Sequence, residues 1–90
     1  MISKTTPAFR LRLKALPADI QKQAREAFKR FQQNPAYPGL HYEQMKRRKT
    51  ILHSARIGLH YRALAYEEAD ILYWFWIGSH SEYDQLLERP

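Results

Sequence analysis

A histidine and a tyrosine lie three residues apart near the C-terminus, in the segment GSHSEYDQLL. Histidine titrates near neutral pH and a tyrosine hydroxyl can donate or hold a proton. His80 and Tyr83 together could therefore move the protons when a phosphodiester is cleaved by its own 2′-hydroxyl. Three residues are also about one helical turn, so the alternative is that both residues only cap and pack a terminal helix.

Two arginines, Arg56 and Arg62, fall on neighbouring strands of a predicted hairpin. A guanidinium within a strand is costly to bury. It either pairs with a carboxylate or faces outward, where its planar fork can bind a phosphate with two hydrogen bonds. Carboxylate pairing stays open as an alternative because the sequence offers three candidate partners: Glu43, Glu67 and Glu82.

Four consecutive cations lie between two predicted strands: Lys46, Arg47, Arg48 and Lys49. Like charges in a connecting loop repel one another unless a polyanion supplies the opposite charge. The run therefore indicates contacts with nucleic-acid phosphates, and its alternative is an ordinary solvated loop.

The composition is that of a globular domain with a strong positive charge. Among 90 residues, 44% are hydrophobic, which is enough for one modest core, so we expect residues 1–90 to form a single domain. The 15 Lys and Arg exceed the 9 Asp and Glu and give a net charge of +6. This excess favours a polyanion or an acidic protein as partner.

Several classes of site and location are excluded by what the sequence lacks. Without cysteine there is no disulfide, thiolate metal site or cysteine nucleophile. The spacings of the four histidines match no compact ligand motif, so we expect no metal and no other cofactor. The N-terminal residues MISKTTPAFRLRLKALP lack the apolar run of a signal peptide, and no stretch is long enough to cross a membrane. We expect a cytoplasmic protein.

Two helices are predicted in the first third of the chain. Thr5 or Thr6 followed by Pro7 is a helix start, and Pro17 separates the first helix from the second. Apolar residues then recur at steps of three and four, which is typical of a helix with one buried face. These residues are Phe9, Leu13 and Leu16 in the first helix, and Ile20, Ala24, Ala27, Phe28 and Phe31 in the second.

From Thr50 onward the apolar period is two, which is typical of strands. Residues 51–57 and 59–65 form a predicted hairpin around Gly58. Residues 71–77 are apolar on both faces, as in a central strand. In this strand we expect Tyr73, Phe75 and Ile77 to face the helices, which leaves Trp74 or Trp76 as candidates for a binding surface.

These elements predict an α+β domain. Two N-terminal helices pack on one face of a small antiparallel sheet of three to four strands, and Ser79 caps a short C-terminal helix. Ile2 could begin an additional edge strand.

Three stretches, in this order, resemble the RelE/ParE superfamily of toxins from type II toxin-antitoxin systems: LPADIQKQAREAFKRFQQNP, SARIGLHYRAL and WFWIGSHSEYDQLL. The resemblance runs from about Thr5 to Leu87, and its most specific part is R-I-G-x-x-Y-R-A-L followed by W-I-G-x-H-x-x-Y. It implies a RelE-like fold. It also implies a monomeric toxin that is neutralised by an acidic, partly disordered antitoxin and can assemble with it into a hetero-oligomer.

The resemblance leaves the activity open between two kinds of toxin. RelE-like members are ribosome-dependent endoribonucleases, or mRNA interferases, which cut mRNA in the ribosomal A site and so inhibit translation and arrest growth. ParE-like members poison DNA gyrase and are not known as nucleases. A third possibility is an inactive domain that only binds an antitoxin. We expect the mRNA interferase, with the ribosome and mRNA as partners.

The resemblance also implies roles for single residues. Arg62 matches the arginine that contacts the scissile phosphate in RelE-like toxins, and Arg56 matches a basic strand residue. His80 would donate a proton to the leaving 5′-oxygen, and Tyr83 would orient or deprotonate the 2′-hydroxyl. The run from Lys46 to Lys49 would bind the RNA backbone, although it falls earlier in the chain than the lysine pair of RelE itself.

Overall fold

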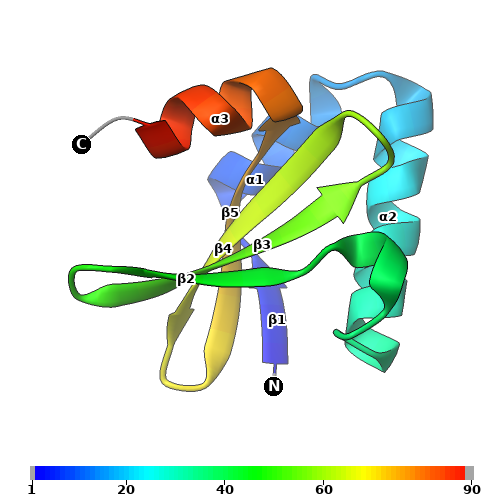
Figure 1. Ribbon diagram of the computed structural model, residues 1–90. Coiled ribbons are helices and arrows are strands. Elements are labelled where there is room, and N and C mark those ends of the chain that lie inside the picture. The colour runs from blue at the N-terminus through cyan, green and yellow to red at the C-terminus, as the bar shows by residue number, and fades with distance from the viewer. Residues whose placement is uncertain (1, 89–90) are drawn as a thin grey trace.

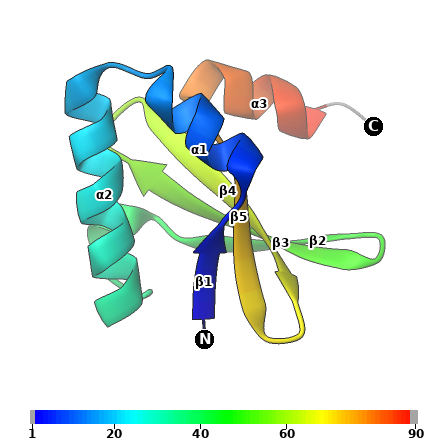
Figure 2. The ribbon, with the colours of Figure 1, turned by 180° about the vertical axis from the view of Figure 1, so that it is seen from behind.

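A computed structural model describes residues 2–88 as a twisted sheet with helices α1 and α2 on one face and helix α3 at one end (Figures 1 and 2). The strands are β1 (Ile2–Thr5), β2 (Glu43–Arg47), β3 (Thr50–Ile57), β4 (Tyr61–Glu68) and β5 (Ile71–Ser79). The helices are α1 (Pro7–Lys14), α2 (Ala18–Gln33), the short 3-10 turn η1 (Pro38–Leu40) and α3 (His80–Glu88).

Helix α1 begins where the sequence predicts. The Thr6 hydroxyl accepts a hydrogen bond from the backbone N–H of Phe9 at 3.2 Å and donates one to the carbonyl of Trp74 at 3.0 Å. This side chain thus caps α1 and ties it to β5. Helix α2 buries Ala24, Ala27 and Phe31 against the sheet, which confirms the two N-terminal helices and their packing on one face.

The sheet has five strands in the order β1-β5-β4-β3-β2. Strands β2 to β5 are antiparallel neighbours, but β1 runs parallel to β5. The α+β class and the antiparallel strands β2 to β5 agree with the expectation, and the additional edge strand at Ile2 is confirmed as β1. The expected number of three to four strands is too low, and β1 makes the sheet not wholly antiparallel. The four residues of β1 include an exposed Ile2, and their sequence alone gives little indication of a strand. Pairing with β5 holds them in the sheet.

A bulge in β5 decides which aromatic side chains are buried. Trp76 pairs with Leu64 and Trp74 with Ala65, so Phe75 is an extra residue in the ladder. Trp74 faces the helices and meets the Phe31 ring edge-on at 5.4 Å. Ile77 faces the helices as expected. The same expectation is wrong for Tyr73 and Phe75, because both lie on the opposite face with Tyr66.

The C-terminal helix starts with a reciprocal cap. The backbone N–H of Glu82 donates to the Ser79 hydroxyl at 3.1 Å, and the Ser79 N–H donates to the Glu82 carboxylate at 3.0 Å. These bonds from the Ser79 N–H and hydroxyl hold the pKa of Glu82 below its usual range. The predicted short terminal helix and its cap are confirmed. None of the helices within residues 2–88 is long and apolar enough to cross a membrane.

We expect Glu82→Gln to reduce the free energy of unfolding at neutral pH by less than about 1 kcal/mol, because the amide keeps the cap but loses the charge. Because the pKa of Glu82 is lower in the folded than in the unfolded state, its carboxylate stabilises the fold fully above the unfolded-state pKa. The difference in free energy of unfolding between wild type and variant should therefore shrink as the pH falls through the folded-state pKa of Glu82. Urea denaturation at a series of pH values measures this difference. Glu26→Gln, which changes an exposed carboxylate on α2, is the control. If its effect on the free energy of unfolding depends on pH as much as that of Glu82→Gln, the stabilising role assigned to the Glu82 carboxylate is wrong.

Candidate functional site

Four of the predicted site residues, Arg56, Arg62, His80 and Tyr83, meet on the outer face of the sheet, which is the face turned away from α1 and α2. Arg56 on β3 is directly opposite Arg62 on β4, and Arg62 is opposite Gly78 on β5. Tyr83 and His80 come from α3, which begins two residues after Gly78. We call Arg56, Arg62, His41, His80 and Tyr83 the arginine cluster.

Arg62 is almost fully buried, with 7% of its surface exposed. Its Nε–H donates to the Ser54 hydroxyl at 2.9 Å and its Nη2 donates to the carbonyl oxygen of His41 at 3.0 Å. The Tyr83 ring lies 5.0 Å from the guanidinium carbon. These partners are all neutral. Among the side chains of residues 2–87 Arg62 forms no ion pair, so its positive charge is held in place by neutral groups.

Arg56 is half-buried and faces the same side. Its Nε–H donates to the Gly58 carbonyl at 2.9 Å, and its Nη1 lies 3.1 Å from Nε2 of His41. Arginine can only donate hydrogen bonds, so the His41 ring must accept through Nε2 and is neutral in this arrangement. Of the three carboxylates considered as partners, Glu67 pairs with His53 and Glu82 with Arg12. Glu43 lies on the outer face, opposite Ser54 in the sheet, but forms no ion pair with either arginine within the described residues.

His41 is fixed by its neighbour in the chain. Its backbone has φ of +43°, the left-handed region, directly after η1. Tyr42 enters the core on the other side of the sheet, with its ring 5.2 Å from that of Phe31 and stacked on His53 at 5.6 Å. These contacts hold Tyr42 on the helix-covered face of the sheet. His41, the residue before it, contacts the arginines on the outer face.

A buried polar chain anchors Tyr42. His53 is fully buried, its Nε2 lies 2.9 Å from the Glu67 carboxylate, and its Nδ1 is hydrogen-bonded to the Tyr42 hydroxyl. A carboxylate accepts from Nε2–H, which leaves Nδ1 as acceptor for the Tyr42 hydroxyl. Burial raises the pKa of Tyr42 and keeps it a donor. Sequence reasoning did not identify this chain, although a histidine at an inward position of an apolar strand was the available signal.

His80 and Tyr83 differ in what they offer a ligand. His80 is exposed, and its Nδ1 lies 3.2 Å from the Asp84 carboxylate one turn later. Tyr83 is 6% exposed and its hydroxyl donates to Met45 Sδ at 3.8 Å. The two rings lie 6.1 Å apart. The Tyr83 hydroxyl therefore faces the sheet, while its ring packs between Arg62 and His80.

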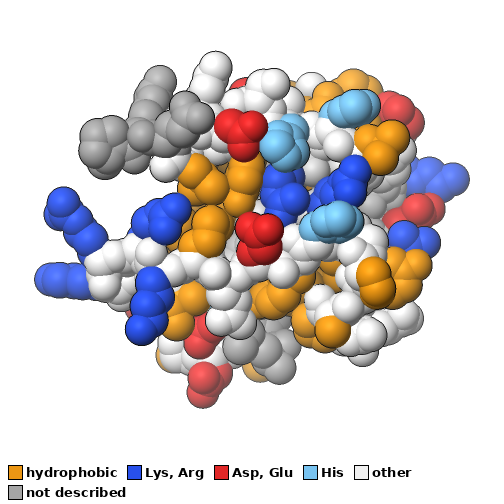
Figure 3. Space-filling model, viewed as in Figure 1, with side chains coloured by type: hydrophobic (Ala, Val, Ile, Leu, Met, Phe, Trp, Pro, Cys, Tyr) orange, Lys and Arg blue, Asp and Glu red, His pale blue; other side chains and the backbone are white. Residues whose placement is uncertain are grey.

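The cationic run does not join this cluster. Lys46 and Arg47 end β2, and Arg48 and Lys49 form the turn of a hairpin that projects from the body (Figure 1). Lys and Arg side chains gather at the tip of this hairpin, apart from a second group of cations and histidines nearer the middle of the same view (Figure 3). Arg56 lies six positions after Thr50 along β3, which is about 20 Å of extended chain.

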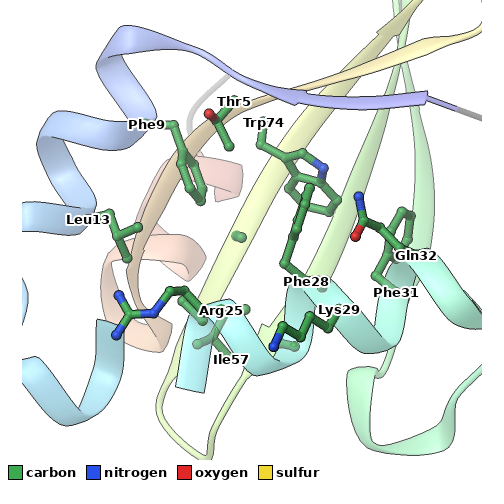
Figure 4. Close-up of a pocket in the computed structure, with 14 residues that line it drawn as sticks. Thr5, Phe9, Leu13, Arg25, Phe28, Lys29, Phe31, Gln32, Ile57 and Trp74 are labelled. Atoms are coloured by element: carbon green, nitrogen blue, oxygen red, sulfur yellow. The ribbon is translucent and has the colours of Figure 1, made fainter. Parts of the chain in front are cut away.

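A pocket of about 370 Å³ opens between α1, α2 and the helix-covered face of the sheet. Its walls are mainly apolar, and Arg25 and Lys29 of α2 contribute cations (Figure 4). Trp74 lines it, and the indole N–H has no hydrogen-bond partner although the residue is only 3% exposed. This N–H is itself inaccessible from the pocket, so the mainly apolar walls allow the pocket to receive an apolar group.

We expect His53→Leu to lower the free energy of unfolding by about 1–3 kcal/mol, because the Tyr42 hydroxyl and the Glu67 carboxylate lose their buried partner. Denaturant unfolding measures the change. His60→Leu is the matched control, since His60 is exposed and lies outside this chain, and it should change stability by no more than about 0.5 kcal/mol. Equal effects of the two substitutions would show that the polar chain contributes nothing specific.

Comparison with known families agrees with the resemblance found in the sequence. Residues 18–85 match the model of the ParE-like toxin domain. No curated protein and no solved structure matches the chain significantly. The matched region includes α2, the strands β2 to β5 and most of α3, and so contains every residue of the arginine cluster. The chain therefore belongs to the ParE-like toxin domain family and is a toxin of the toxin-antitoxin type, with an antitoxin as its partner.

Proposed function

We propose that this toxin is a metal-independent endoribonuclease that cuts mRNA on the ribosome and so inhibits translation. The observation that carries the proposal is that two arginines, which have no carboxylate partner among the described side chains, lie at the same end of the outer face as the exposed His80, and the Tyr83 ring contacts both Arg62 and His80. RNA supplies its own nucleophile, the 2′-hydroxyl. The protein needs only to stabilise the charge that develops on the phosphate and to move protons.

In this mechanism the two arginines have different tasks. Arg56 is half-buried on the outer face and binds the scissile phosphate directly, using the side of the guanidinium that Gly58 and His41 leave free. Arg62 lies deeper and contributes its fixed positive charge to the same place, where it favours the phosphate as negative charge builds up.

His80 is the proton donor to the leaving 5′-oxygen. In its protonated form the ring donates Nδ1–H to Asp84 and gives its Nε2 proton to the leaving oxygen, while the proton of the attacking 2′-hydroxyl passes to solvent water. Tyr83 is better placed to position than to exchange protons, because its hydroxyl is directed at Met45 Sδ. We assign it the task of holding Arg62 and His80 in their relative places.

The cations of the hairpin, Lys46 to Lys49, have a supporting task. They are exposed and lie about 20 Å from Arg56. Contacts of such exposed cations with a phosphate backbone add affinity without sequence preference and weaken as salt is added. We propose that they bind the backbone of ribosomal RNA or mRNA away from the site of cleavage.

The antitoxin is proposed to be acidic, because the toxin carries a net charge of +6. The pocket between α1 and α2 suits one of its apolar side chains, since Arg25 and Lys29 beside the pocket attract acidic neighbours.

A second candidate is a toxin that inhibits DNA gyrase without cutting RNA. Two observations favour it. The matching family is described as ParE-like, and the buried Tyr83 hydroxyl and the tightly held Arg62 also suit a purely structural cluster. In that case the basic outer face would bind the target protein.

We expect wild-type protein to produce cuts at the ribosomal A site in a reconstituted translation system, mapped by primer extension. His80→Ala should reduce cleavage by about 10²–10⁴-fold, because it removes the proton donor. Arg56→Ala should also reduce it strongly. Lys22→Ala is the control, since Lys22 is an exposed cation on α2 outside the cluster, and it should cleave like wild type.

Intact mRNA with wild-type protein would contradict the endoribonuclease. Inhibition of gyrase supercoiling under those conditions would then support the second candidate. A protein that inhibits neither reaction but binds its antitoxin would be an inactive domain.

A further inference from the structure

A cluster of aromatic side chains on the outer face takes no part in the core or the arginine cluster. Tyr66 of β4 stacks on Tyr73 of β5, with ring centroids 5.2 Å apart and planes at 22°. Phe75, the bulged residue, lies 5.7 Å from Tyr66. All three are half-buried. We call Tyr66, Tyr73 and Phe75 the aromatic platform, and we propose that it stacks unpaired bases of the RNA strand whose phosphate lies at Arg56.

No element of the described chain covers the platform. Helices α1 and α2 lie on the opposite face (Figures 1 and 2). Helix α3 covers the other end of the outer face, where Tyr83 packs near Trp76 and over Arg62. A patch of neighbouring aromatic rings on an open sheet face marks a binding surface more often than scattered apolar residues do.

The platform is continuous with the arginine cluster. Arg62 and Tyr66 lie on the same strand and the same face, four residues or about 13 Å apart. A single-stranded RNA with a phosphate at Arg56 can therefore lay its next bases along β4 and β5. This part of the inference rests on the proposed function.

The charges beside the platform suit a nucleic acid. In the register of the sheet, exposed Lys4 of β1 is opposite Tyr73, and exposed Arg47 lies on the same face at the far edge, on β2. The acidic residues on this face are Glu68 at the end of β4 and Glu43 at the start of β2. Aromatic rings that bind bases, with cations at both edges for phosphates, are the usual composition of a surface for single-stranded nucleic acid.

The test is binding of a short unstructured RNA with 2′-O-methyl groups, which cannot be cut through its 2′-hydroxyls, followed by fluorescence anisotropy. Tyr66→Leu and Tyr73→Leu should each weaken binding about tenfold, because leucine keeps the apolar bulk but cannot stack. Tyr66→Phe should bind like wild type. Tyr37→Leu is the matched control, since Tyr37 is 40% exposed and lies against Arg30 rather than on the sheet.

An abasic oligonucleotide of the same length separates stacking from charge. Wild type and the leucine variants should bind it equally and more weakly than wild type binds RNA. The inference is overturned if the leucine variants bind RNA as wild type does, or if Tyr66→Phe loses as much affinity as Tyr66→Leu. Loss of antitoxin binding with unchanged RNA binding would make the platform a protein interface and would also overturn it.

Measurements of mRNA cleavage and of RNA affinity on the same proteins distinguish a failure of the proposed nuclease from a failure of the proposed platform. If wild-type protein leaves ribosome-bound mRNA intact but its RNA affinity still depends on Tyr66 and Tyr73, the proposed nuclease fails and the platform holds. If mRNA is cut but RNA affinity does not depend on these tyrosines, the platform fails and the nuclease holds.

Discussion

The outer face of this toxin is organised around the buried positive charge of Arg62, which has no negative partner among the side chains that the structure describes. Taking a guanidinium out of water costs several kcal/mol unless its N–H groups are satisfied. Here a hydroxyl, a backbone carbonyl and an aromatic ring do this for Arg62. These groups belong to β3, the segment before β2, and α3, so the single charge requires three parts of the chain to be in place together. Neutral partners leave its electrostatic attraction for an anion intact.

The cluster also depends on the core behind the sheet. His41 and Tyr42 are adjacent in the chain, but His41 contacts the two arginines while Tyr42 packs against Phe31 of α2. Tyr42 is in turn hydrogen-bonded to the buried His53, which Glu67 orients. The packing of α2 on one face is therefore linked to the position of the arginines on the other face. A substitution in α2 that shifts Phe31 is expected to displace these arginines, although Phe31 itself lies on the helix-covered face.

The parts of this structure that could be predicted are those set by local periodicity. The apolar stripes of α1 and α2, the hairpin around Gly58 and the Ser79 cap were all readable from sequence, and the hairpin placed Arg56 beside Arg62. The bulge at Phe75 was not readable, because a register shift depends on the partner strand. It reversed the expected faces of Tyr73 and Phe75 and so created the aromatic platform. The roles of His41 and Tyr42 were not predictable from local sequence, because their contacts are with residues distant in the sequence.

The most direct test of this account is the rate at which the Arg62 Nε–H exchanges with water, measured by side-chain ¹⁵N NMR. Comparison with the spectrum of Ser54→Ala assigns the Arg62 signal. A guanidinium buried and bonded to Ser54 and His41 should show a slowly exchanging Nε–H, in contrast to those of exposed arginines such as Arg47. In Ser54→Ala this exchange should become faster. Exchange in the wild type as fast as that of Arg47 would mean that Arg62 is not held, and the organisation of the outer face described above would be wrong.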